Sequence, residues 1–259
     1  MKAADARVML TGAAGGIGHA MALALREAGA AVMGVGRGDA PAGTAWVRAD
    51  LNTDEGVAAV AVAAEQWRAN VVVHAAGMPA FGPLPSASPA QMQAVLQANL
   101  LAPMRLTQSL LPALLRQPRA QVVFVGSVLG RIGLPGFSVY GASKAGLHGF
   151  AEALRRELAD TTVRVQILGP RSTRTPFNGA DVLDYNRATG TAMDAPETVA
   201  AALLALIESE AAERFLGFPE RLAVRLNGVL GALLDGSFAR HRRSVSPAPL
   251  QTASRGPVR

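Results

Sequence analysis

A short apolar run that leads directly into a glycine-rich turn and a helix is the feature that most restricts the fold of this chain. Residues 7–10 have the composition of a buried strand, and the turn at residues 11–18 follows at once. The helix after it repeats apolar residues every fourth position and has a glycine to end it: Ile17, Met21, Leu25 and Gly29. Glycine permits a tight turn and a close approach to a pyrophosphate, whose oxygens the first helical N–H groups would face. The segment therefore predicts a nucleotide-binding turn between strand and helix.

Strand-like and helix-like segments then alternate along most of the chain. The remaining strand-like runs are apolar throughout, which is typical of strands buried on both faces: residues 31–35, 45–49, 71–74, 121–125 and 163–168. Helix-like stretches cover about 54–67, 89–115 and 140–158. This order predicts the α/β class, with a single doubly wound Rossmann-type domain over residues 1–218 in which a parallel sheet carries helices on both faces.

Tyr140 and Lys144 stand four residues apart, so a helix would present both side chains on one face. A cation beside a phenol favours the phenolate and brings proton exchange within reach of neutral pH. Taken alone, this spacing is typical of a solvated surface pair. Together with the glycine turn it indicates an enzyme.

The glycine turn, Asn99, Ser127 and the Tyr140/Lys144 pair, in this order and spacing, resemble the short-chain dehydrogenase/reductase family. The resemblance covers about residues 7–219 and implies that these four residues are catalytic. It implies that Tyr140 exchanges a proton with the substrate oxygen while Ser127 hydrogen-bonds that oxygen. Lys144 would favour the phenolate and bind the nicotinamide ribose. Asn99 would hold a water molecule that links Lys144 to solvent.

Cofactor contacts are expected from the glycine turn, from Arg37 and from the family pattern. The complete set is Gly12, Ala14, Gly15, Gly16, Ile17, Gly18, Arg37, Asp50, Leu51, Ala75, Ala76, Gly77, Tyr140, Lys144, Pro170, Thr173 and Thr175. Arg37 follows the second strand, where its guanidinium could pair with a 2′-phosphate and no carboxylate stands at the strand tip to repel one. We therefore expect NADP. NAD is the alternative, because Asp39 lies two residues further on.

Two segments depart from the family pattern. His74 and Ala75 stand where the family has two asparagines, and Arg171 stands where it has the glycine of a Pro-Gly pair. We expect His74 to be a packed structural histidine. Arg171 would place a charge near the nicotinamide end of the site.

The substrate region is expected in the loop at 172–196 and in apolar residues between the serine and the tyrosine: Leu129, Ile132, Leu134 and Phe137. They favour a small hydrophobic carbonyl or alcohol, or an acyl substrate. Arg131 and Arg171 are either receivers for an anionic group or ordinary surface arginines.

Residues 219–243 predict an amphipathic helix, with Leu222, Leu226 and Leu230 on its apolar face. It would serve as a lid over the substrate, as a subunit contact, or as a peripheral contact with a membrane. Residues 244–259 are rich in Pro, Ser and Ala and predict a disordered tail. The family resemblance implies a homo-oligomer, either a dimer or a tetramer.

Composition excludes several other classes of function. The chain has no cysteine and only 4 scattered histidines, so no metal site is expected. The net charge of +6 comes largely from the C-terminal part, which lacks the interleaved aromatic residues of nucleic-acid binders. No apolar run has the length of a signal peptide or a membrane span, and a cytoplasmic location is expected. The alternative function is that of a non-catalytic, NADP-binding redox sensor.

Overall fold

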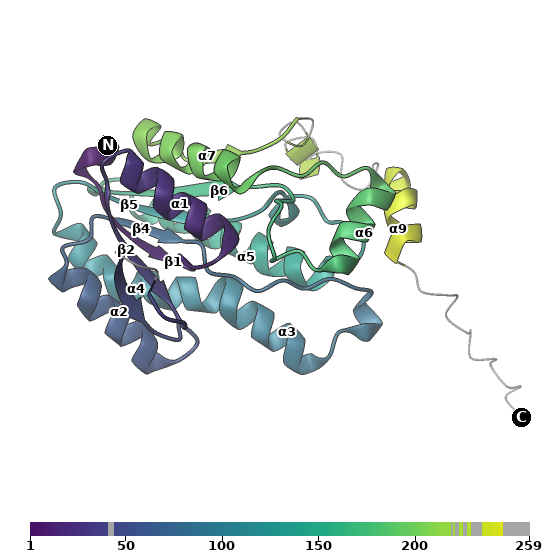
Figure 1. Ribbon diagram of the computed structural model, residues 1–259, viewed down its shortest axis with the longest axis horizontal. Helices are drawn as coiled ribbons and strands as arrows, with labels where there is room; N and C mark the ends of the chain where they lie inside the picture. The colour runs from purple at the N-terminus through teal and green to yellow at the C-terminus, as the bar shows by residue number, and fades with distance from the viewer. Residues whose placement is uncertain (41–43, 219, 221–222, 225–226, 229–234, 246–259) are drawn as a thin grey trace, which may run out of the picture.

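A parallel sheet in the order β3-β2-β1-β4-β5-β6-β7 forms the centre of the molecule (Figure 1). The computed structural model describes residues 1–40, 44–218, 220, 223–224, 227–228 and 235–245. Its strands are β1 (Arg7–Thr11), β2 (Ala31–Gly36), β3 (Ala45–Arg48), β4 (Val71–His74), β5 (Ala120–Val125), β6 (Val163–Gly169) and β7 (Glu213–Phe215). Every residue of β4 and β5 is buried. The predicted doubly wound fold is confirmed.

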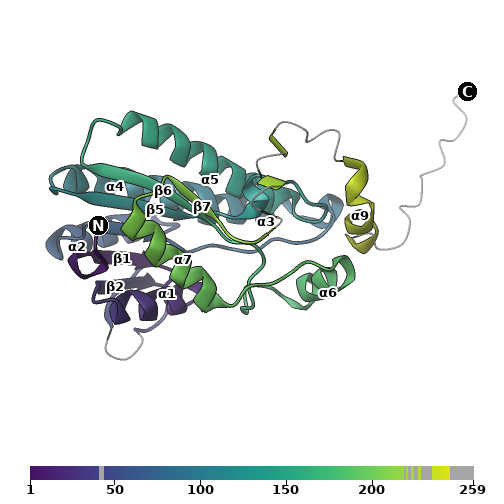
Figure 2. The same ribbon diagram turned by 90° about the horizontal axis from the view of Figure 1, so that it is seen from above.

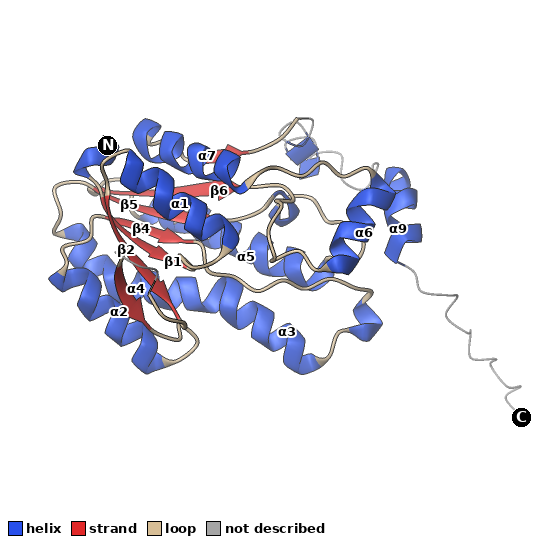
Figure 3. Cartoon of the chain, in the orientation of Figure 1, coloured by secondary structure: helices blue, strands red, loops and turns tan. Residues whose placement is uncertain are grey.

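Helices cover both faces of the sheet, as the colouring by secondary structure makes plain (Figure 3). One face carries α1 (Gly16–Glu27) and α7 (Pro196–Ser209), which pack together. The other carries α2 (Asp54–Gln66), α4 (Ala102–Leu115) and α5 (Ser138–Glu157). Each layer closes a core of aliphatic side chains against the sheet, around Met21 and Leu203 on one face and around Leu106 and Leu147 on the other. Burial of these apolar faces holds the layers together.

The order of the strands reverses between β1 and β4. The chain runs outward from β1 through β2 to β3, and then returns to build β4 to β7 on the other side of β1. Connections at the carboxyl ends of β1 and β4 therefore diverge and leave a crevice, which is where open α/β sheets bind ligands. The fold places the glycine turn after β1 and residues 75–77 after β4 at this crevice.

Several elements extend what the sequence predicted. The short edge strand β7, the helix α7 and the helix α6 (Ala180–Thr189) were not predicted, and α6 lies within the expected substrate loop. Viewed from above, α6 and α9 (Ala239–Val245) lie beside each other, away from the sheet (Figure 2).

The apolar face predicted for the C-terminal helix, with Leu222, Leu226 and Leu230, lies outside the described residues. Further along the chain, η5 (Asp235–Phe238) and α9 are helical. Helix α9 includes the first two residues of the predicted tail. The rest of that tail also lies outside the described residues. Among the residues that the structure describes, no helix is both long and apolar enough to cross a membrane.

Candidate active site

A cavity of about 280 Å³ opens at the crevice and collects most of the predicted site residues. Those that line it are Gly12, Gly16, Ile17, Gly18, Ala75, Ala76, Gly77, Ser127, Tyr140, Lys144, Pro170, Thr173 and Thr175. The predicted residues that do not line it are Ala14, Gly15, Arg37, Asp50, Leu51 and Asn99. Residues that lie far apart in the sequence thus meet in one hollow.

The glycine turn after β1 fits a pyrophosphate. Gly12 has a φ of +69°, and a Cβ on Gly18 would stand 2.1 Å from the carbonyl oxygen of Gly12, so side chains are excluded there. Gly15 is the N-cap residue of α1, and no side chain caps this helix end. The first N–H groups of α1 therefore lack a side-chain partner and can bind phosphate oxygens. The residues present fit a dinucleotide.

Thr11, which the sequence analysis did not assign to the site, holds the two cofactor-facing segments together. Its Oγ1 accepts hydrogen bonds from the backbone N–H groups of Ala75 and Ala76, both at 3.1 Å. The hydroxyl is buried at the end of β1, where a polar group needs a partner. A threonine at the end of an otherwise apolar strand was the available signal.

Tyr140 and Lys144 lie one turn apart near the start of α5, as predicted. The Lys144 ammonium lies 5.9 Å from the centroid of the Tyr140 ring and donates a hydrogen bond of 2.9 Å to the carbonyl of Val125. Ser127 follows β5, and its Oγ accepts a hydrogen bond of 3.1 Å from the backbone N–H of Leu129. The three side chains line the same wall of the cavity.

Burial dominates the protonation of this group. It raises the pKa of Tyr140 to about 12, against the opposite effect of a hydrogen bond with Ser127, and it lowers the pKa of Lys144 to about 8. The predicted effect of Lys144 on the phenol acts in the opposite direction and stays a prediction. At neutral pH the phenol carries its proton and can act as an acid.

Asn99 lies in a π-helical segment, Gln97–Leu101, that joins α3 (Pro89–Leu96) to α4. Its buried amide donates to the Met78 carbonyl at 2.9 Å and to Ser143 Oγ at 3.0 Å, and its Oδ1 accepts from the Met78 N–H at 2.7 Å. The side-chain donors are therefore fully used. A water molecule would have to bind at an acceptor, either the second lone pair of Oδ1 or the backbone carbonyl.

Pro103 explains why the helix is irregular next to Asn99. In an α-helix the carbonyl of Asn99 would accept from the N–H of the residue four positions later, which is Pro103 and has no N–H. The ring of a proline also crowds this carbonyl and favours a local irregularity, here the π-helical segment. The Asn99 to Pro103 spacing was a sequence signal that the analysis missed.

The residues predicted to meet adenosine lie outside the cavity, at the ends of β2 and β3. Arg37 is exposed, and among the described residues it forms no ion pair. Asp39 instead pairs with Arg48 at 3.5 Å. The Asp50 carboxylate accepts a hydrogen bond of 3.0 Å from the N–H of Asn52 within its own turn, next to Leu51.

Both departures from the family pattern have structural partners. His74 is buried, lies 2.9 Å from Thr107 Oγ1 through Nε2, and stacks on Phe124, so the prediction of a packed histidine is confirmed. Burial lowers the pKa of His74 to about 3. Arg171 lines the cavity but is paired with two carboxylates, those of Asp194 and Glu220.

Arg131 is likewise engaged by carboxylates, because it lies 3.6 Å from Glu152 and 3.7 Å from Glu213. The other predicted arginine is therefore also a paired residue, not a free receiver for an anion.

His148 is a buried residue behind Ser127 that the sequence analysis did not single out. The backbone N–H of Ser127 donates to its Nε2 at 3.4 Å, and its ring fills the space where Gly126 and Gly130 lack side chains. Burial lowers the pKa of His148 to about 3, and the charges of Arg131 and Lys144 act in the same direction. The ring is therefore neutral in the folded protein.

Aromatic rings form the outer part of the cavity. Phe81, Phe137 and Tyr185 contact one another with centroids 4.8 to 5.5 Å apart, and Phe177 lies 6.1 Å from the Tyr140 ring. The predicted Leu129, Leu134 and Phe137 line the cavity, whereas Ile132 is buried outside it. The phenol of Tyr185 lies 2.6 Å from His241 Nδ1 on α9, so the C-terminal helix adjoins this end.

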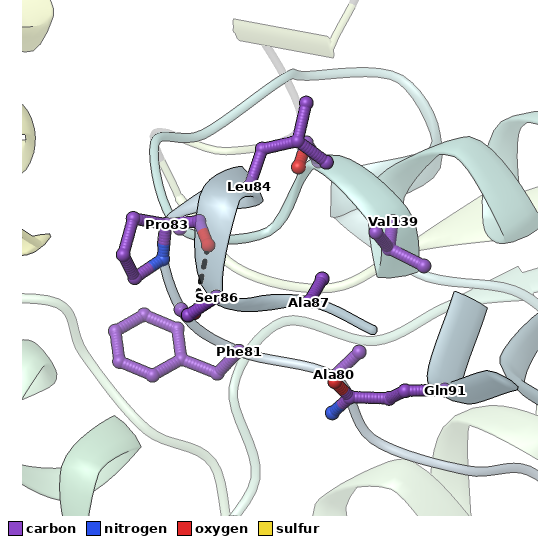
Figure 4. Close-up of a pocket in the computed structure, with 11 residues that line it drawn as sticks. Ala80, Phe81, Pro83, Leu84, Ser86, Ala87, Gln91 and Val139 are labelled. Carbon is purple, nitrogen blue, oxygen red and sulfur yellow. Dashed lines mark hydrogen bonds between the residues drawn. The ribbon is translucent and has the colours of Figure 1, made fainter. Parts of the chain in front are cut away.

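A second hollow, of about 20 Å³, lies beside the main cavity between residues 80–91 and the start of α5 (Figure 4). Ala80 and Phe81 line both. The dashed line in Figure 4 is the 2.8 Å bond that Ser86 Oγ donates to the Pro83 carbonyl. The lining of this second hollow contains no charged side chain.

Nowhere in the described part of the chain do three or more His, Cys, Asp or Glu side chains gather as a metal site would require.

Comparisons with known proteins agree with this geometry. The family model described as short chain dehydrogenase matches residues 6–186. The crystal structure of a short chain dehydrogenase from Burkholderia cenocepacia J2315 in complex with NADP superposes with a TM-score of 0.81 and 25% identity, covering 92% of this chain and 99% of that one.

Two curated relatives are similar over most of the chain. The oxidoreductase claN of Passalora fulva is 35% identical over 183 residues, which are 66% of this chain and 84% of claN. Retinol dehydrogenase 8 of Homo sapiens is 31% identical over 215 residues, which are 77% of this chain and 68% of the human protein.

Proposed function

The chain belongs to the short-chain dehydrogenase family of oxidoreductases, and from this premise we propose that it is an NADP(H)-dependent reductase of hydrophobic carbonyl compounds. The observation that carries the proposal is the composition of one cavity. A phosphate-binding turn, a hydroxyl and a phenol for a substrate oxygen, and an apolar aromatic outer wall all line it. The NADP complex of the Burkholderia protein supports the choice of cofactor.

When bound, NADPH supplies the hydride for the carbonyl carbon. Tyr140 would donate its phenolic proton to the carbonyl oxygen as that oxygen gains negative charge. Because burial keeps this phenol protonated at neutral pH, it is ready to act as an acid in the reducing direction. Ser127 would donate a hydrogen bond to the same oxygen, which orients the carbonyl and stabilises the developing charge.

Lys144 and Asn99 would return a proton to Tyr140. The pKa of Lys144, lowered to about 8, allows this ammonium to exchange protons near neutral pH. A water molecule held by the backbone carbonyl of Asn99 would connect it to solvent. Both residues adjoin Gly77, where a Cβ would stand 3.1 Å from Asn99 Oδ1 and 3.9 Å from Lys144 Nζ. In the oxidising direction the same groups would act in reverse.

Arg37 supports NADP over NAD. Its exposed guanidinium at the end of β2 has no competing ion pair among the described residues, whereas Asp39 is engaged with Arg48. An arginine there can bind a 2′-phosphate with two hydrogen bonds.

The aromatic outer wall supports a hydrophobic substrate. Phe81, Phe137, Phe177 and Tyr185 give broad apolar contact, which suits a ketone or aldehyde with a bulky apolar group. Retinol, named for one relative, is an apolar alcohol.

The test is consumption of NADPH and of NADH, followed by absorbance, with a panel of apolar ketones, aldehydes and acyl thioesters. We expect turnover with NADPH that Tyr140→Phe abolishes while NADPH binding, measured by fluorescence titration, is retained. Tight NADPH binding without turnover on any compound would instead favour the redox-sensor alternative. That alternative is not favoured, because such sensors have no need of the tyrosine and lysine found here.

We also propose that the C-terminal region is a lid over the substrate, since α9 packs on α6 and His241 contacts Tyr185 at the cavity.

Members of the family are often oligomers, and a dimer or tetramer is proposed here. Light scattering coupled to size-exclusion chromatography would give the oligomeric state.

A further inference from the structure

Arg171 is the charged residue in the cavity wall that the family pattern does not lead one to expect. It stands directly after Pro170, at a position where the family pattern has a glycine. Both Arg171 and Glu220 line the cavity. The side chain of Arg171 is 19% exposed, that of Asp194 11% and that of Glu220 23%. These three residues, the Arg171 cluster, are therefore mostly shielded from solvent, and their charges act strongly on what enters the cavity.

The hydrogen bonds of Arg171 are divided between its two partners. Nε and Nη2 donate to one Asp194 oxygen at 3.0 and 2.8 Å. Nη1 donates to both Glu220 oxygens at 3.1 and 3.3 Å. Little donor capacity of the fork is left for a ligand. The cluster carries one positive and two negative charges, so Arg171 is not a free cation.

The backbone around the cluster holds it in place. Two backbone hydrogen bonds join the two ends of the substrate loop. The Asp194 N–H donates to the Ser172 carbonyl and the Arg174 N–H donates to the Asp194 carbonyl, both at 2.9 Å. A Cβ on Gly217 would stand 2.9 Å from Arg171 Cδ and 2.6 Å from a Glu220 oxygen, so the guanidinium packs closely against the segment after β7. Arg171 therefore cannot turn toward a substrate without leaving its carboxylate partners.

We propose that Glu220, by occupying Arg171 within the substrate cavity, determines specificity by selecting neutral carbonyl substrates over analogues that carry a carboxylate. The inference rests on the proposed reductase function and defines its substrate class. An incoming carboxylate would meet an arginine whose charge Glu220 already balances, and would lose water without gaining a donor pair. A neutral apolar group loses little water and contacts the aromatic rings instead. Lys144 also lines the cavity, but it is the same residue in every variant of this cluster, so differences between variants report on Arg171 and its partners.

The test compares a neutral aryl ketone with its acid, for example the methyl ester of para-acetylbenzoate and para-acetylbenzoate itself, or the same pair built on the best neutral ketone of the panel. The ratio of kcat/KM for the neutral compound to that for the acid is the readout. Glu220→Gln keeps the size of the side chain but removes its charge and one acceptor oxygen, so that one Nη1 donor of Arg171 loses its partner. We expect this ratio to fall by about tenfold, the effect of one hydrogen bond to a charged group.

Two variants control for other causes. Glu213→Gln makes the same change of charge on an acid that pairs with Arg131 and does not line the cavity, and we expect it to leave the ratio unchanged. Adding Arg171→Gln to Glu220→Gln should return the ratio to the value of the parent protein, because the released cation is then removed. Melting temperatures of all variants identify any that fail to fold. Asp194→Asn is a second variant that removes a carboxylate partner from Arg171.

The failures are distinguishable. If no neutral ketone is reduced with NADPH, the proposed function fails and this inference fails with it. If neutral ketones are reduced but folded Glu220→Gln discriminates against the acid as strongly as the parent protein, only the inference is wrong. It is equally wrong if Glu220→Gln changes the KM for NADPH and leaves the ratio unaltered, since the cluster would then act on the cofactor.

Discussion

Substituting His74 by asparagine will reduce the loss of stability that this protein suffers in mild acid. Burial holds the pKa of both His74 and His148 at about 3 in the folded protein. In the unfolded chain a histidine titrates near ~6.5. Below that pH the two histidines bind protons in the unfolded chain but not in the folded protein. The free energy of unfolding therefore falls as the pH falls from about 6.5 towards about 3.

The magnitude follows from the same values. Between about pH 7.5 and about pH 5.5, each of these histidines removes roughly 1.4 kcal/mol from the free energy of unfolding, because only the unfolded form takes up its proton. The two together remove about 3 kcal/mol, a large share of the stability of an ordinary domain. Asparagine has no charge at any pH in this range, and its amide can still pair with Thr107. His74→Asn should therefore lose roughly 1.4 kcal/mol less than the parent protein over this range.

The assay is urea denaturation followed by circular dichroism at the two pH values, for the parent protein, His74→Asn and His19→Asn. His19 is exposed on α1 and serves as the matched control, since it has the same chemistry without burial. The difference between the two pH values is compared, not the absolute stability, because His74→Asn also leaves a small gap beside Phe124. If His74→Asn lost as much stability as the parent protein, the buried neutral histidine would not be the cause.

Three further outcomes are expected. Gly18→Ala should lower the melting temperature and weaken NADPH binding at least tenfold in a fluorescence titration, because its Cβ would stand 2.1 Å from the Gly12 carbonyl oxygen; unchanged binding would contradict the proposed phosphate turn. Arg37→Glu should lower the ratio of kcat/KM for NADPH to that for NADH by about tenfold or more, and an unaltered ratio would remove Arg37 from cofactor selection. Pro103→Ala restores an N–H at the fourth residue after Asn99 and removes the ring that crowds the Asn99 carbonyl, so it should lower kcat without lowering the melting temperature; equal turnover would show that the irregular helix is not needed for the proton relay.

The elements that the sequence predicted well are those whose pattern is local. The glycine turn was recognisable because strand, glycines and helix follow one another directly, and the buried strands were recognisable because they are apolar at every position. Tyr140 and Lys144 were placed together by the helical repeat alone. The shift in the pKa of Tyr140 depends on what packs around the ring, and spacing along a helix does not contain that information.

The order of the elements, the glycine turn and the residues that carry the proposed chemistry could all be predicted from the sequence, since each depends on neighbours within a few positions. Which distant side chains meet depends on the tertiary structure. It set Thr11 against Ala75 and Ala76, His148 behind Ser127, and Arg171 between Asp194 and Glu220. Those contacts join residues separated by many positions, and they form only when packing of the helices on the sheet brings the loops at its carboxyl edge together.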